Sequence, residues 1–422
     1  MKIGFVSFRL AGTDGVSLET AKIAQILSRS GHQIYYFAGE LNPPDADLGP
    51  LDVPLAGTRL CKLAHFTHPE IAWITNYAFG NRRAHPKLRM RIEQAATALK
   101  EELEAFINEA GIDVLVAQNV FAIPLNLPLS MALRRVIAEQ QIPCIAHNHD
   151  FYWERQRFDV TCVDDVLYST FPPSLPNVRH LVINTQAQRA LAERHVESVY
   201  LPNIFDYAVE PPAPDAYNAD LRQEIGLRDG ELLFLQPTRV VRRKGIELAI
   251  ELVSRLGDLP IKLYITHHAE YDTLDYLSEI LALAARQSVS LHYLPMRFAP
   301  HRKPGEGIHK TYSLWDAYVH ADFITYPSLY EGFGNALLET LYFRKPLLVN
   351  RYQVYQDDIE TTGIQAITID EAITAETVDA VRTLLADPDR IANMAEHNFR
   401  AAREHFSYEA VEPKLLQILQ SF

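Results

Sequence analysis

Two glutamates, Glu331 and Glu339, flank a glycine-containing turn and the start of a predicted helix in the segment YPSLYEGFGNALLETLYFRKP. The glycines of the turn, Gly332 and Gly334, let the backbone approach a ligand closely and adopt positive φ angles. The apolar spacing that follows predicts a helix beginning near Asn335, and the free amides of such a helix start attract an anion. The arrangement suits a phosphorylated sugar. The alternative is that Glu331 caps the helix and Glu339 is a solvated helix charge.

A second group of charged residues, in QPTRVVRRKGIELAIE, lies between a predicted strand and a predicted helix. Arg239 and Lys244 flank the turn, whose length allows both cations to converge on one anion. Charge-assisted hydrogen bonds to a departing diphosphate stabilise a transition state most when water is excluded, and they would replace a metal ion. The two other cations of the turn, Arg242 and Arg243, are interpreted as solvated surface charges.

A third group follows a predicted strand that ends at Ala146, in AHNHDFYWERQRF. Aromatic side chains pack on the C–H surfaces of sugars, and charged groups bind hydroxyls or acidic substituents. His147 and His149 could alternatively bind a metal ion, but no third or fourth ligand has suitable spacing. The two arginines of the segment favour an acceptor that carries a carboxylate or phosphate. The residues predicted to bind the acceptor are Asp150, Tyr152, Trp153, Arg155 and Arg157.

The first predicted strand leads into a glycine-containing turn whose residues Gly15, Val16 and Ser17 could present backbone amides to the acceptor or to the donor phosphate. The alternative is an ordinary strand-to-helix turn that Ser17 caps. The turn matches neither the GxGxxG fingerprint nor the GxxxxGK[ST] phosphate loop. Dehydrogenase and kinase functions therefore lose their main support.

Buried strands alternate along the chain with amphipathic helices, which is the pattern of parallel α/β sheets. The first strand is followed by a predicted helix from about Ser17 to Ser30. A proline-rich and acidic segment at 205–226 predicts a linker between two such halves of the chain. The predicted strands are 2–8, 33–39, 112–119, 142–148, 180–184 and 199–203 in the first half, and 232–238, 261–267, 290–295, 322–328 and 346–350 in the second.

Composition supports two domains, since 422 residues with 48% hydrophobic residues can bury sizeable cores. The formal charge of -13 disfavours nucleic acid as a partner. The three cysteines, Cys61, Cys144 and Cys162, are far apart, which argues against a disulfide framework. Without a signal segment or a run of 18 apolar residues, the expected location is cytoplasmic.

The segment around Glu331 and Glu339 resembles, residue for residue, the E-x7-E signature of retaining glycosyltransferases of family 4. The basic turn and the opening glycine loop are also similar to motifs of that family. The resemblance implies the GT-B fold, an α/β architecture of two Rossmann-like parallel-sheet domains facing a central cleft. It implies domains 1–205 and 206–405, with a C-terminal helix over 406–422 that crosses back to the first domain.

The family also implies residue roles. Glu331 lies against the donor sugar, Glu339 binds the ribose, Arg239 and Lys244 bind the diphosphate, and His149, preferred over His147, contacts the sugar near the reacting centre. Four of these residues form the predicted catalytic set: His149, Glu331, Arg239 and Lys244. The predicted donor-binding residues are Gly15, Arg239, Lys244, Gly332, Phe333, Gly334, Asn335 and Glu339.

The activity implied is transfer of a hexose, glucose or mannose, from a nucleoside diphosphate sugar to a hydroxyl of a small soluble sugar or polyol, anionic ones included, with formation of an α-glycosidic bond. The expected donor is UDP-glucose or GDP-mannose, no cofactor is obligatory and Mg2+ is not required. Alternatives left open are a nucleotide-sugar epimerase, a phosphorylase and a non-catalytic sugar-nucleotide binding protein.

Three features depart from this interpretation or compete with it. His267, His268, Ala269 and Glu270 stand where many relatives have a glycine-rich turn. DxD sequences occur at 45–47 and 387–389, but neither follows a strand convincingly. A basic cluster at 82–91 could attract anionic lipids, although its few apolar residues favour a solvated or acceptor-lining patch over a membrane site.

Overall fold

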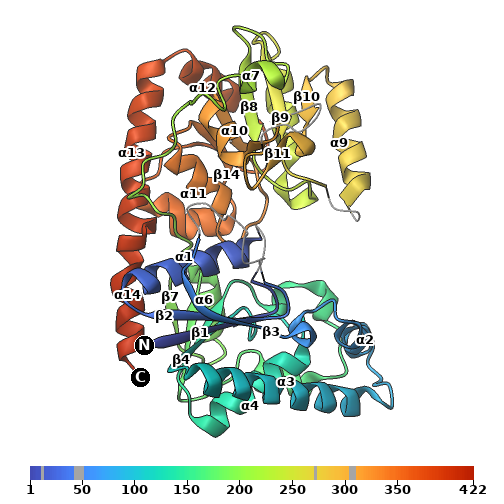
Figure 1. The fold of residues 1–422 in the computed structure, drawn as a ribbon. Helices are drawn as coiled ribbons and strands as arrows, with labels where there is room; N and C mark the ends of the chain where they lie inside the picture. Colours follow the sequence, from blue (N-terminus) through green and yellow to red (C-terminus); the bar gives the residue numbers. More distant parts are fainter. Residues whose placement is uncertain (11–13, 42–51, 270–272, 304–309) are drawn as a thin grey trace. The chain divides into compact units, whose positions relative to one another are not determined.

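The computed structural model describes residues 1–10, 14–41, 52–269, 273–303 and 310–422. These residues form two compact units (Figure 1). The first unit contains Met1–Asn203 and Val411–Phe422, and the second contains Ile204–Ala410. Each unit has its own parallel sheet and its own helices.

The sheet of the first unit has, within the described residues, seven parallel strands in the order β3-β2-β1-β4-β5-β6-β7. The strand order reverses between β1 and β4, and ligands of open α/β sheets bind at the carboxyl ends of strands around such a switch point. The strands are β1 (Lys2–Ser7), β2 (Gln33–Ala38), β3 (Leu55–Leu60), β4 (Val114–Gln118), β5 (Cys144–Asn148), β6 (Val178–Val182) and β7 (Ser198–Tyr200).

Helices cover the first sheet, with α1 on one side and α3 and α4 on the other (Figure 1). Leu103 and Phe106 of α3 pack with Leu133 of α4 and Leu115 of β4 in one buried core. The helices of this unit are α1 (Gly15–Arg29), α2 (Pro69–Ala78), α3 (Leu88–Ala110), α4 (Leu127–Gln140), α5 (Asp164–Thr170), α6 (Thr185–Ala192) and most of α14 (Tyr408–Gln420), with short 3-10 turns η2 (Lys62–Ala64), η3 (Tyr152–Glu154) and η4 (Gln156–Phe158).

The main sheet of the second unit has six described parallel strands in the order β10-β9-β8-β13-β14-β15. Its switch point lies between β8 and β13. The strands are β8 (Leu232–Gln236), β9 (Ile261–Ile265), β10 (Leu291–Tyr293), β13 (Phe323–Tyr326), β14 (Leu347–Asn350) and β15 (Ile367–Ile369), with a separate pair, β11 (Phe298–Ala299) and β12 (Tyr312–Ser313).

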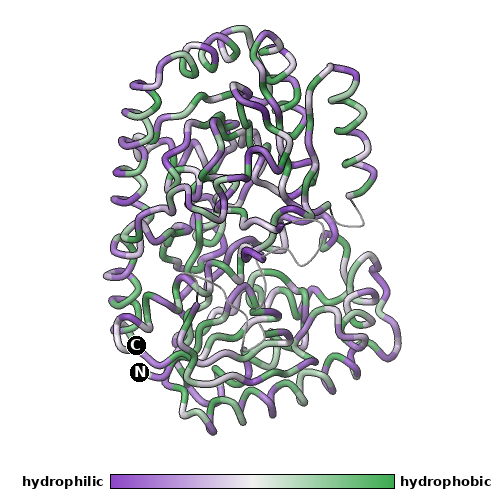
Figure 2. Tube along the Cα trace, turned by 45° about the horizontal axis from the view of Figure 1, so that its top comes forward, coloured by the Kyte–Doolittle hydropathy of each residue, from purple (hydrophilic) through white to green (hydrophobic). Residues whose placement is uncertain are grey.

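Amphipathic helices surround the second sheet, and Figure 2 shows hydrophilic and hydrophobic residues alternating along helices, as expected for elements with one buried face. The α-helices are α7 (Leu221–Glu224), α8 (Ile246–Arg255), α9 (Leu274–Arg286), α10 (Leu314–His320), α11 (Asn335–Tyr342), α12 (Ala375–Leu385) and α13 (Pro388–Phe406). The shorter turns are η5 (Arg242–Lys244), η7 (Pro295–Arg297), η8 (Tyr355–Ile359) and η9 (Glu360–Thr362).

The predicted strands are present, with ends shifted by a few residues. Strand β5 runs to Asn148, the end of the predicted range 142–148, so His147 lies within the strand and not after an end at Ala146. The sequence did not predict β3, whose residues alternate between exposed and half-buried at the sheet edge, nor β15, which has only three residues. In the segment predicted as a linker, Tyr207 is instead buried in the second unit and donates a hydrogen bond to the Leu338 carbonyl at 3.0 Å.

Within the part of the chain that the structure describes, no helix combines the length and hydropathy needed to cross a membrane.

Candidate active site

The basic turn and the glutamate loop meet at the carboxyl ends of β8 and β13, which are neighbours in the second sheet. Lys244 Nζ forms an ion pair with one carboxylate oxygen of Glu331. Arg243 Nη1 lies 2.7 Å from the other oxygen and also donates to the Tyr330 carbonyl at 3.0 Å. Two segments about 87 residues apart in the chain are thus joined by three charged side chains.

Backbone contacts hold the two loops together. The Leu329 amide donates to the Arg243 carbonyl at 2.8 Å. Gly245 has a φ of +59°, and a Cβ at this position would overlap the carbonyl oxygen of Pro327. Only glycine permits both this left-handed conformation and this close approach. The turn that carries Lys244 is therefore packed directly on the loop that follows β13.

The Glu331 carboxylate is buried, with only 6% of the residue exposed, and Lys244 is 8% exposed. Burial raises the pKa of Glu331, but Lys244 and Arg243 favour its charged form more strongly, so the pKa lies below its ordinary value. Burial lowers the pKa of Lys244, and Glu331 partly restores it. The cluster contains two cations for one carboxylate and keeps a positive charge at the strand ends.

The predicted helix start is confirmed, since α11 begins at Asn335. Gly334 before it has a φ of +136°, and a Cβ there would lie 2.8 Å from the Tyr352 hydroxyl and 3.1 Å from the Tyr326 hydroxyl. Tyr352 donates to the Phe333 carbonyl at 2.6 Å. The turn before α11 therefore lies close to the hydroxyls of two tyrosines, and Tyr352 holds it by a hydrogen bond.

The remaining residues predicted to bind the donor occupy different environments. Glu339 lies in α11 and accepts a hydrogen bond from Tyr318 of α10 at 2.9 Å. The Phe333 ring is buried against Phe406, so this residue presents its backbone rather than its side chain. Gly332 and Asn335, at the two ends of this turn, are half-buried.

Arg239 is exposed at the carboxyl end of β8 and contributes to the electrostatics of Lys244. His267, which follows β9 next to β8, belongs to the same charged group. Burial, together with the neighbouring Lys244, Arg239 and His268, lowers the pKa of His267 to about 4. His267 was known from the sequence only as a departure from a glycine turn. The sequence signal that could have placed His267 in the site was its position just after a strand that neighbours β8.

The two arginines interpreted as solvated charges have different environments. Arg242 is exposed, pairs with Glu279 at 2.6 Å and lies over the Tyr276 ring, as expected for a surface side chain. For Arg243 the interpretation is wrong, because its guanidinium binds Glu331. The partner lies on another loop, so the local sequence gave no signal for this contact.

In the first unit, His147 and His149 meet Gln118 at the carboxyl end of the sheet. Gln118 Oε1 lies 3.0 Å from His147 Nδ1 and 3.3 Å from His149 Nε2. Both rings can donate to this single oxygen, which assigns the tautomers by inference from the hydrogen bonds. Burial lowers the pKa of His149 to about 4, although Asp150 and Asp14 raise it. His149 is therefore neutral at pH 7.

The predicted acceptor residues fall into two groups. Asp150 accepts from Asn119 Nδ2 at 3.0 Å and forms an ion pair with Arg155. Arg157 reaches the surface, and partial desolvation of its guanidinium, together with the nearby Arg155, lowers its pKa. These charged groups lie close together at the surface of the first unit.

The aromatic pair of that segment, Tyr152 and Trp153, is half-buried and packs on neighbouring side chains. The Trp153 ring stacks on Phe151 with centroids 4.4 Å apart, and the Arg194 guanidinium lies over the same ring at 3.8 Å. Tyr152 packs edge-on against Trp153 and Phe171. The protein itself thus provides the stacking partners of the Trp153 ring.

The opening loop does not have the Ser17 cap that was considered as the alternative to a ligand-binding turn. Helix α1 begins at Gly15, but its cap is Asp14 rather than Ser17. The Asp14 carboxylate accepts from the Ser17 amide at 3.2 Å and from the Ser17 hydroxyl at 2.7 Å. Asp14 also pairs with Arg9 at 3.1 Å.

No group of three or more His, Cys, Asp or Glu side chains suited to a metal ion occurs among the described residues. Asp387 of the second DxD sequence caps α13 by accepting from the Arg390 amide at 2.9 Å. The first DxD sequence, at 45–47, and Glu270 lie outside the described residues, as does Gly12 of the opening loop.

Two parallel-sheet α/β units of this kind make up the GT-B fold, and this protein has that fold. The solved structure of Anabaena HepE in complex with UDP and glucose matches with a TM-score of 0.67 and 15% identity, covering 100% of both chains. The predicted fold class is thereby confirmed. No family model matches the chain.

Curated relatives identify the family more closely. Mannosylglucosylglycerate synthase of Thermotoga maritima is 32% identical over 446 aligned positions, which cover 98% of this chain and 98% of the relative. The enzyme of the same name from Petrotoga mobilis is 31% identical over 392 positions, covering 87% and 86%. The chain belongs to the family of these mannosylglucosylglycerate synthases.

Proposed function

We propose that this enzyme transfers a mannosyl group from a nucleoside diphosphate mannose to a hydroxyl of glucosylglycerate or a similar anionic glycoside, and that the new bond is α. The observation that carries the proposal is the identity of 32% over nearly the full length to an enzyme named for a product with mannosyl, glucosyl and glycerate units. The acceptor would carry a carboxylate, in agreement with the anionic acceptor that Arg155 and Arg157 favour.

On the donor side, Arg239 and Lys244 would bind the diphosphate and Glu339 the ribose. Glu331 and the amides from Gly332 to Asn335 would position the sugar. Arg243 fixes Glu331 by a hydrogen bond of 2.7 Å and so determines where this carboxylate can accept from a sugar hydroxyl. The positive charge left on the cluster would stabilise the charge that develops on the leaving diphosphate.

The proposed reaction breaks the bond between the anomeric carbon and the diphosphate oxygen, and forms a bond from the same carbon to the acceptor oxygen on the same face. The acceptor proton passes to the departing phosphate oxygen. Glu331 is ionised but bound by two cations, which makes it a poor covalent nucleophile, so no glycosyl-enzyme intermediate is assigned. Neutral His149 would support the reacting face of the sugar as a hydrogen-bonding group.

The test is product analysis with UDP-, GDP- and ADP-linked hexoses and glucosylglycerate, with and without a chelator. We expect one disaccharide-glycerate product, formed from a mannosyl donor, whose anomeric NMR signals show retention. Donor conversion without acceptor would indicate the epimerase, and a requirement for inorganic phosphate would indicate the phosphorylase. Loss of turnover in chelator, restored by Mg2+ or Mn2+, would contradict the metal-independent mechanism.

We expect Arg155→Ala and Arg157→Ala to raise the KM for the anionic acceptor by about 10- to 100-fold, because a hydrogen bond to a charged group contributes roughly 1.5–3 kcal/mol. The donor KM should change little. Initial rates at varied acceptor concentration measure the effect. Gln156→Ala is the matched control, since Gln156 is exposed between the two arginines and uncharged. Unchanged acceptor KM in both arginine variants would remove this segment from the acceptor site.

A further inference from the structure

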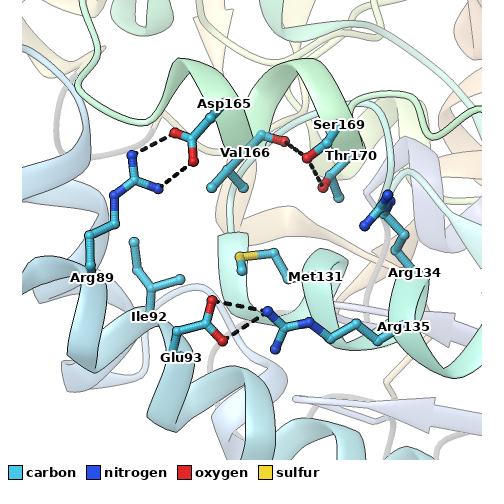
Figure 3. A pocket seen from close by; sticks show the side chains of 10 residues that line it. All are labelled: Arg89, Ile92, Glu93, Met131, Arg134, Arg135, Asp165, Val166, Ser169 and Thr170. Atoms are coloured by element: carbon cyan, nitrogen blue, oxygen red, sulfur yellow. Dashed lines mark hydrogen bonds and ion pairs between the residues drawn. The ribbon is translucent and has the colours of Figure 1, made fainter.

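A pocket of about 200 Å³ lies in the first unit between α3, α4 and α5 (Figure 3). Its walls combine apolar side chains, such as those of Ile92 and Met131, with arginines, carboxylates and two hydroxyls. None of the individual residues predicted above to bind the donor or the acceptor lines it, although Arg89 belongs to the basic cluster at 82–91. The pocket is therefore a candidate for a separate ligand.

Two of its three arginines are neutralised by carboxylates of the same pocket. Arg89 binds both oxygens of Asp165, at 2.9 and 2.5 Å. Arg135 binds both oxygens of Glu93, at 2.9 and 2.8 Å. Figure 3 shows these two pairs on the α3 side of the pocket. Three guanidinium groups face two carboxylates, so one positive charge remains, on Arg134.

Arg134 extends from α4 toward Thr170 of α5, apart from the two ion pairs (Figure 3). Its Nε is buried and has no hydrogen-bond partner in the structure as described. A buried donor without a partner is uncommon in native proteins and calls for an explanation. The planar fork of a guanidinium group matches the oxygens of a carboxylate or phosphate.

Two hydroxyl groups complete the polar lining beside Arg134. Ser169 donates to the Val166 carbonyl at 3.3 Å, and the Ser169 and Thr170 hydroxyls lie 3.3 Å apart. Thr170 is only 1% exposed. Because the Ser169 hydrogen is directed to a carbonyl, the Thr170 hydroxyl can turn its hydrogen to an anion without breaking that bond.

We propose that this pocket binds the oxyanion group of a small metabolite, a phosphate or a carboxylate, with Arg134 as the charged donor and Thr170 as a second donor. The apolar side chains of Ile92, Met131 and Val166 accommodate the carbon skeleton. The bound anion connects α4 to α5, so it stabilises the first unit. The site takes one singly or doubly charged group, since only one cation of the pocket has no counter-ion within it.

The test is titration calorimetry with inorganic phosphate at constant ionic strength. The Lys244→Met background removes a principal phosphate ligand of the donor site in the other unit. We expect saturable binding in Lys244→Met and at least tenfold weaker binding in the Lys244→Met, Arg134→Met double variant. Repeating both titrations with glycerate distinguishes a phosphate site from a carboxylate site, and Arg134-dependent binding of either anion supports the proposal.

A second variant, Thr170→Val, keeps the side-chain volume and removes the hydroxyl, and we expect severalfold weaker binding in the same background. Circular dichroism shows whether the Arg134→Met variant folds. If it does not fold, the binding constant of Thr170→Val tests the proposal in its place. Equal binding with and without Arg134, or no saturable binding of either anion in Lys244→Met, would overturn the proposal. Neither outcome depends on glycosyl transfer, so failure here is distinguishable from failure of the proposed function.

Discussion

We expect Lys244→Met to lower kcat/KM by about 10²- to 10³-fold, the usual effect of removing one donor that stabilises developing negative charge. Lys244 is a buried cation at the carboxyl end of β8, and methionine keeps its length and apolar stem without the charge. The loss should fall on kcat more than on the donor KM, because charge on the departing oxygen grows in the transition state. Initial-rate kinetics with varied donor measure both constants.

Arg242→Met is the control from the same turn. The Arg242 side chain is 64% exposed and its guanidinium binds Glu279 at the surface, so we expect nearly normal kinetics. Equal losses in the two variants would mean that general positive charge of the turn matters rather than the placement of Lys244. A fully active Lys244→Met enzyme would exclude this residue from the diphosphate site.

The second large effect is on stability. We expect Glu331→Ala to lower the free energy of unfolding by about 3–5 kcal/mol at pH 7, because it leaves Lys244 and Arg243 without their shared counter-charge in a buried site. Chemical denaturation of both proteins measures the difference. Glu279→Ala is the matched control: it breaks an exposed pair of the same turn, and we expect little change.

The effect of Glu331 should depend on pH with a defined sign. Its pKa in the folded protein lies below the ordinary value of 4.5. The unfolded chain therefore binds the proton first, and the stabilisation is present above about pH 4.5 and is lost as the pH falls through the lower pKa of the folded state. The two proteins should converge in stability toward acidic pH. A difference that grows on acidification would contradict the ion-pair assignment.

The strands that were predicted from the sequence are those in which a buried apolar run lies between turn residues. Strand β5 reads CIAHN and is buried throughout, whereas β3 reads LAGTRL and is largely exposed. An edge strand needs no apolar face on its outer side, so its pattern resembles a loop. The three-residue strand β15 is set by its pairing with β14, which is a tertiary contact.

The sequence predicted those site residues that lie within recognisable local motifs. Lys244 and Glu331 lie in recognisable segments, and the structure brings them into contact. Arg243 was interpreted, together with Arg242, as a solvated charge of the turn, because its partner is 88 residues away in the sequence. The aromatic segment raised an expectation of ring surfaces for sugar, but Trp153 already has Phe151 and Arg194 as its stacking partners.

The contact of Gly245 with Pro327 has a mechanical consequence for the second unit. A methyl group at position 245 would act as a wedge that separates the turn bearing Lys244 from the loop bearing Glu331. With hydrogen alone at that position, the backbones of the two segments lie in direct contact, so the packing of one backbone on the other sets the spacing between a cation and a carboxylate from different loops.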